Sequence, residues 1–138
     1  MFRFLISAIL FIFLLTPVKA ESADQQAFQT VISGQLEAFK KDDYQTAYSF
    51  AAPIVKGIFP NVDTFMGMVK RGYGPIYKNS KYVFTELKTD TLGRPAQHVI
   101  ITASDGKRYE AVYAMQQQPD GSWKIAGVQM LEIPSVDA

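Results

Sequence analysis

The sequence contains no cysteine, only one histidine and only one tryptophan among its 138 residues. Without cysteine there is no disulfide framework, so packing alone must stabilise the fold. Zinc sites in proteins are built mainly from cysteine and histidine, and a single histidine argues against such a site. His98 is also the only side chain whose ordinary pKa lies near neutrality, which makes it a candidate general base.

Several motifs of catalysis and phosphate binding are missing as well. The chain has no glycine-rich phosphate loop, no G-x-S-x-G nucleophile motif and no EF-hand loop. We therefore expect no cofactor and no bound metal. The charge is almost balanced, with 14 Lys and Arg against 13 Asp and Glu, and such a balance gives no electrostatic basis for binding nucleic acid.

The first twenty residues differ from the rest of the chain. Arg3 precedes an apolar run of 12 residues, Phe4–Leu15, and small residues stand at Val18 and Ala20. This order predicts a signal peptide that is cleaved after Ala20. The run is shorter than the ~20 residues of a membrane-spanning helix, and an uncleaved N-terminal anchor is the alternative. We expect a periplasmic or secreted protein that meets the membrane only through this segment, with a single domain over residues 21–138.

Helical patterns dominate the first half of that domain. Ser22 and Gln25 form a capping-box pattern, and the apolar residues that follow recur on one helical face: Phe28, Ile32, Leu36 and Phe39. Gly34 within this helix suggests close packing. A second helix is expected to end at Pro53, and a third to be capped by Asn61 or Asp63. The segment "PIVKGIF" between them is expected to be an edge strand.

Strand patterns fill the second half. "KYVFTELK", "QHVIITA", "KRYEAVYAMQQ" and "WKIAGVQMLEI" are separated by turn signals. Helices first and a meander of strands afterwards predict an α+β fold. We expect three N-terminal helices packed on a curved antiparallel sheet.

The pair Asp42 and Asp43 has two interpretations. A catalytic carboxylate pair must converge on one substrate, whereas neighbouring residues at the start of a helix diverge. A side-chain oxygen there can instead accept from free backbone N–H groups. We expect Asp43 to cap the second helix with Asp42 assisting.

The turns predict which side chains share a face of the sheet. A two-residue loop at Asp105-Gly106 places His98 opposite Tyr113, and a three-residue loop at Pro119–Gly121 places Tyr113 opposite Gly127. Because cross-strand partners share a face, one face should carry His98, Ile100, Tyr109, Tyr113, Met115, Trp123, Ile125, Gln129 and Leu131.

We expect this aromatic face to meet the helices and to form a pocket. The predicted pocket residues are Tyr48, Met66, Val69, Tyr73, His98, Tyr113, Met115 and Gln129. The opposite face is predicted to be a homodimer interface formed by Val99, Ile101, Val112, Val128 and Met130.

Two stretches carry a family resemblance. "QLEAFKKDDYQTAYSFAAPIVKGIFPNVDTFMGMVKRGY" followed by "GSWKIAGVQML" resembles the bacterial family called domain of unknown function 4864. The order of elements resembles the broader nuclear-transport-factor-2-like superfamily, in which a curved sheet wraps around helices as a cone with a pocket inside. The resemblance implies that fold and dimerisation, and it brings no activity with it. None of the inward strand positions predicted here is Asp or Glu, so the carboxylate base of ketosteroid-isomerase-like members has no counterpart.

Three functions remain in competition. The first is a binding module for a small, largely apolar ligand, which the aromatic face with isolated polar groups favours. The second is a homodimeric structural or interaction protein. The third is an enzyme with His98 as general base and Tyr113 as its partner, and the missing motifs argue against it.

Overall fold

A computed structural model describes residues 22–135 of the chain. The predicted signal peptide and its cleavage after Ala20 lie outside these residues. Within the described range, five helices are followed by four strands, so the predicted α+β class is confirmed. Among the same residues, no helix is both long enough and apolar enough to cross a membrane.

The first helix, α1, covers Ala23–Lys40, and its N-terminus is capped by Ser22, whose Oγ accepts from the Gln25 N–H at 3.1 Å. Its buried stripe contains the four predicted apolar residues together with one amide side chain, Gln35. A Cβ at Gly34 would lie 2.6 Å from Cζ of Phe50. Only glycine therefore fits here without displacing that ring, as the close packing expected from the sequence requires.

Four shorter helices follow. They are α2 (Tyr44–Ser49), α3 (Pro53–Ile58), α4 (Val62–Gly72) and α5 (Gly74–Tyr77). The segment predicted as an edge strand is thus helix α3, because Pro53 occupies its first position, where the fixed φ of proline favours a helix and no N–H is needed. The edge pairing falls instead to Ala51, which forms an isolated parallel bridge with Ile125.

The predicted caps are partly confirmed. Asp43 caps α2 by accepting from the Thr46 N–H at 3.3 Å, and Asn61 caps α4 by accepting from the Thr64 N–H at 2.9 Å. Asp42 does not assist the cap. Its backbone is left-handed, with φ of 54°, and its carboxylate accepts from the Tyr77 hydroxyl at 2.8 Å.

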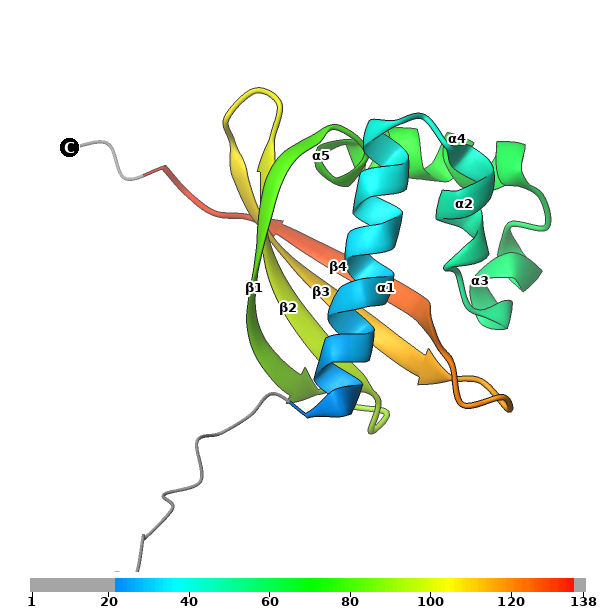
Figure 1. Cartoon of the computed structure of the whole chain (residues 1–138). Coiled ribbons are helices and arrows are strands. Elements are labelled where there is room, and N and C mark those ends of the chain that lie inside the picture. Colours follow the sequence, from blue (N-terminus) through cyan, green and yellow to red (C-terminus); the bar gives the residue numbers. More distant parts are fainter. Residues whose placement is uncertain (1–21, 136–138) are drawn as a thin grey trace, which may run out of the picture.

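The four strands form one antiparallel sheet in chain order: β1 (Asn79–Thr89), β2 (Pro95–Ala103), β3 (Arg108–Gln117) and β4 (Trp123–Glu132). The sheet is curved and open, with β1 and β4 at its edges (Figure 1). Helix α1 lies across one face, and α2, α3 and α4 lie to the side of β4. We call the face covered by α1 the inner face and the opposite one the outer face.

The register of β2 against β3 differs from the prediction by one residue. The turn has three residues rather than two, since the Ala103 N–H donates to the Lys107 carbonyl at 2.8 Å and Gly106 takes the left-handed position with φ of 85°. His98 therefore pairs with Val112, and Tyr113 pairs with Gln97. A shift of one residue moves every side chain of a strand to the other face.

The register of β3 against β4 begins as predicted and then changes. Met115 pairs with Ile125, as the three-residue loop requires, but Ala126 is an extra residue and Ala114 pairs with Gly127. After this β-bulge, the side chains of β4 lie on the opposite face of the sheet from the one predicted. Gln129 and Leu131 consequently lie on the outer face, and Leu131 is 73% exposed.

These two shifts place four of the five residues of the predicted dimer interface on the inner face. Val99 and Ile101 are fully buried on the inner face, and Val128 and Met130 pack against the same core. Of the five predicted interface residues, Val112 alone lies on the outer face. The physical reason is that both faces of β2 carry apolar side chains, so only the turn and the bulge decide which face is covered.

Candidate functional site: an apolar cavity beside the edge strand

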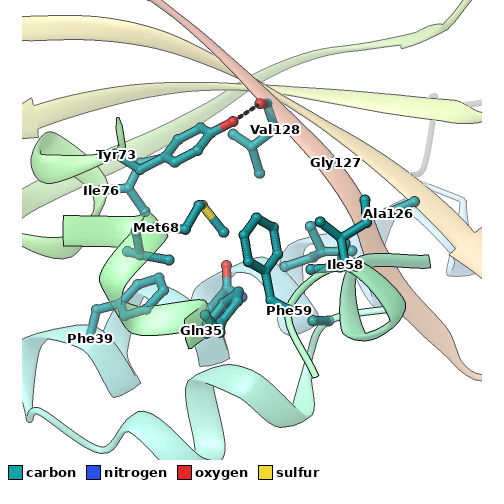
Figure 2. A pocket seen from close by; sticks show the side chains of 15 residues that line it. Gln35, Phe39, Ile58, Phe59, Met68, Tyr73, Ile76, Ala126, Gly127 and Val128 are labelled. Atoms are coloured by element: carbon teal, nitrogen blue, oxygen red, sulfur yellow. Dashed lines mark hydrogen bonds between the residues drawn. The ribbon is translucent and has the colours of Figure 1, made fainter. Parts of the chain in front are cut away.

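A cavity of about 260 Å³ lies between the helices and the edge of β4 (Figure 2). Fifteen residues from α1, α3, α4, α5, β4 and the segments between them line it, and none of them is charged. They are Gln35, Phe39, Ala51, Val55, Ile58, Phe59, Phe65, Met68, Val69, Tyr73, Ile76, Ile125, Ala126, Gly127 and Val128.

The bulge of β4 helps to make the space. Ala126 and Gly127 form the strand wall of the cavity at the point where the register changes, and their side chains are too small to fill it. A bulge bends its strand and often occurs next to a functional site. Ile58 lines the cavity and is also 68% exposed, so the cavity reaches solvent beside α3.

Two polar side chains lie on this apolar wall. The Tyr73 hydroxyl donates to the Val128 carbonyl at 2.9 Å (Figure 2). The Gln35 Nε2 donates to the Ala47 carbonyl at 3.1 Å, and the amide oxygen of Gln35 points toward the cavity. Gln35 is only 4% exposed. The cavity therefore combines an apolar surface with one buried amide.

The structure places only some of the predicted pocket residues at the cavity. Val69 and Tyr73 line the cavity. Met66 and Met115 are buried in the core without lining it, and Tyr48 supports its wall by donating to the Phe59 carbonyl at 2.6 Å. The other three predicted residues belong to the sheet and lie elsewhere: His98, Tyr113 and Gln129.

The predicted catalytic pair is not formed, because His98 and Tyr113 lie on opposite faces of the sheet. On the outer face, Nδ1 of His98 lies 2.9 Å from Oε1 of Glu110. On the inner face, the Tyr113 hydroxyl is fully buried and has no hydrogen-bond partner among the described residues. Burial raises the pKa of Tyr113 well above its ordinary value. The one-residue error in register is the cause of the wrong prediction.

A second polar cluster lies at the start of α2. The Tyr77 hydroxyl donates to Asp42, and the Tyr44 hydroxyl lies 3.1 Å from the Tyr77 hydroxyl. Nζ of Lys70 is 4.8 Å from the centre of the Tyr44 ring. The hydrogen bonds of Tyr77 to Tyr44 and Asp42 raise its pKa. Asp42 and Asp43 thus diverge to separate partners, as a helix start requires, and the cluster fastens α2 to α4 and α5.

The sequence did contain a signal for Gln35, which the predicted pocket omitted. The residue occupies a position of the buried stripe of α1, between Ile32 and Phe39. A polar residue at such a position must find a partner inside the protein. By contrast, Ile58 and Phe59 fell in a segment predicted to be a strand, so their place beside α4 and β4 was not predictable from periodicity.

Residues 22–135 hold no group of three or more His, Asp or Glu side chains arranged to bind a metal ion. The walls of the cavity offer an apolar surface, one amide and one hydroxyl.

Comparison with known proteins gives one match. Neither the curated proteins nor the solved structures contain a significant match to the chain. The family described as "Domain of unknown function (DUF4864)" matches residues 21–138, which is most of the sequence. The chain belongs to this family.

Proposed function

We propose that the protein is a binding module for a small, neutral and largely apolar ligand, held in the cavity beside β4. The observation that carries the proposal is the cavity itself, which has about 260 Å³ of space, no charged residue in its walls and an opening beside Ile58. Ligand sites are typically concave and mostly apolar, with a few polar groups that fix orientation. Gln35 and Tyr73 are groups of that kind.

The volume sets the size of the ligand. An apolar cavity of about 150 Å³ accommodates benzene, so a cavity of about 260 Å³ suits a compact ligand of roughly ten carbon atoms. Longer chains would have to extend through the opening beside α3.

Two further features support this proposal. The order of helices followed by an antiparallel meander supports placement in the nuclear-transport-factor-2-like superfamily, where a curved sheet encloses a pocket. The N-terminal apolar segment supports export to the periplasm or the outside, where the protein would meet its ligand.

The test is direct binding of naphthalene, a neutral probe of ten carbons, followed by its own fluorescence. Native mass spectrometry of protein purified without added ligand shows whether a small molecule is already bound. We expect naphthalene to bind in a one-to-one ratio and Val69→Trp to abolish binding, because the larger side chain occupies the cavity. The matched control is Val112→Trp on the outer face, which should leave binding unchanged. Equal binding by both variants, or no binding by the unmodified protein, would refute the proposal.

A second candidate function is self-association through the outer face. Val83, which pairs with Ile100, is 59% exposed, and Leu131 on β4 is 73% exposed in the same row across the sheet. Such exposed apolar side chains would be covered by the same row of a second copy related by a two-fold axis. Light scattering at micromolar concentration tests this: a dimer that Leu131→Asp dissociates supports it, and a monomeric unmodified protein rules it out.

A further inference from the structure

The orientation of the Gln35 amide is fixed by its surroundings. Its Nε2 donates to the carbonyl of Ala47, a residue with no exposed surface. Turning the amide over would set its oxygen against that carbonyl, and two acceptors repel each other. The amide oxygen is therefore held on the side of the cavity, as Figure 2 shows.

This oxygen lacks a donor within the protein. Residues 22–135 form no hydrogen bond to Oε1 of Gln35, although the residue is only 4% exposed. Buried polar atoms in folded proteins nearly always have a partner. Because the cavity is open beside Ile58, this donor is a water molecule or the group of a ligand that displaces it.

The other side chains of the wall offer no donor that would compete. The hydroxyl hydrogen of Tyr73 is already used by the Val128 carbonyl, so Tyr73 can only accept. The other lining side chains are aliphatic, aromatic or thioether. The cavity thus presents acceptors and no charged group. A carboxylate ligand would meet an acceptor with no cation among the lining residues, and an ammonium ligand would be buried without a counter-charge.

On the basis of the proposed function, we propose that the cavity selects a neutral apolar alcohol or phenol whose O–H group donates to Oε1 of Gln35. The apolar part of the ligand packs against the helices and β4. Gln35 is then the residue that determines specificity, and it discriminates against ethers, hydrocarbons and fatty acids of the same size.

Three probes of similar size separate these chemistries: 2-naphthol carries the O–H donor, 2-methoxynaphthalene lacks it, and naphthalene-2-carboxylate is charged at pH 7. Calorimetry on the unmodified protein should show 2-naphthol binding about tenfold more tightly than 2-methoxynaphthalene, the ratio that one buried hydrogen bond supports. The carboxylate should show no measurable binding.

The variant Gln35→Met removes the acceptor and keeps the length of the side chain. We expect the preference for 2-naphthol over 2-methoxynaphthalene to fall to about one, while 2-methoxynaphthalene still binds. Circular dichroism checks that the variant is folded, and if it is not, the three probes on the unmodified protein decide the question.

The outcomes separate the two proposals. Equal affinity for 2-naphthol and 2-methoxynaphthalene in the unmodified protein overturns selection by Gln35 and leaves the binding cavity standing. Tightest binding of the carboxylate overturns selection as well. Binding of none of the three probes, nor of naphthalene, overturns both.

Discussion

The inner and outer faces of the sheet differ less in composition than in what covers them. Neighbouring residues of β2 illustrate this: Ile101 has no exposed surface, whereas Ile100 is half-buried on the other face. Polar residues show the same contrast. Gln97 and Tyr113 are fully enclosed on the inner face, while His98 and Glu110 pair with each other at the outer surface. The location of a residue, rather than its type, therefore determines what it contributes.

The difference in stability cost between the inner and outer faces should be largest for Ile101 and Ile100. Ile101→Ala leaves a void under α1 and should lower the free energy of unfolding by about 2–5 kcal/mol. Ile100→Ala removes the same atoms from a half-exposed site and should cost about 1 kcal/mol or less, since less apolar surface returns to water. Urea denaturation of both variants measures the difference.

If Ile100→Ala proved as costly as Ile101→Ala, the outer face would have to be covered in solution. The cost would then depend on protein concentration, because a second copy stabilises the fold by mass action. A cost independent of concentration would contradict the assignment of the two faces.

The sequence alone was sufficient for the four strands and for the stripe of α1, because these depend on local periodicity, and for caps such as Ser22 and Asp43, but it assigned the segment of α3 to a strand. It was not sufficient for the faces of β2 and of the second half of β4. Ser104-Asp105-Gly106 accommodates a two-residue or a three-residue turn, and the choice moves His98 from one face to the other. The isolated Gly127 is the local signal of the bulge that carries Gln129 outward, and the predicted register did not use it.

The site was less predictable than the fold. Val69 and Tyr73 were among the predicted pocket residues and line the cavity, but the cavity is formed where α1, α3, α4 and α5 meet β4. The contact between α3 and β4 is a tertiary one that local periodicity does not encode. Gln35 carried a local signal that the predicted pocket did not use, a polar residue on an apolar stripe.

The difference between the buried inner face and the outer face can also be tested by the pH dependence of stability. Burial raises the pKa of the Tyr113 hydroxyl above the ordinary value of 10.0. The unfolded chain therefore loses this proton first, and above pH 10 it binds fewer protons than the folded state. The free energy of unfolding should thus be unaffected below pH 10 and should decline above it, by at most about 1.4 kcal/mol per pH unit for this group.

Tyr113→Phe should reduce that alkaline decline without removing it, because the pKa values of Tyr77 and Tyr82 are raised as well. Chemical denaturation at a series of pH values from 8 to about 11.5 measures the slope. The same slope in the variant and in the unmodified protein would show that the Tyr113 hydroxyl is not buried.

At neutral pH, the replacement of Tyr73 and of Tyr113 by phenylalanine should change the stability of the protein differently. Tyr73→Phe loses the hydrogen bond to the Val128 carbonyl and should cost about 1 kcal/mol. Tyr113→Phe removes a buried hydroxyl that has no partner among the described residues, so stability should stay equal or rise slightly. Thermal unfolding of both variants provides the comparison. A larger loss for Tyr113→Phe than for Tyr73→Phe would indicate an ordered water bonded to the Tyr113 hydroxyl.

The smallest effect is expected at the outer surface, where the His98–Glu110 pair is the polar counterpart of the buried groups. The Glu110 side chain is 43% exposed, and polar pairs in contact with water, charged or neutral, contribute at most about 1 kcal/mol. Glu110→Gln keeps the shape and a hydrogen-bond acceptor, so the free energy of unfolding at pH 7 should change by less than about 1 kcal/mol. Binding of naphthalene should also be unchanged, because the sheet separates this pair from the cavity. A weakened affinity in Glu110→Gln would mean that the two faces are coupled, and the separation between a structural outer face and a binding inner side would have to be abandoned.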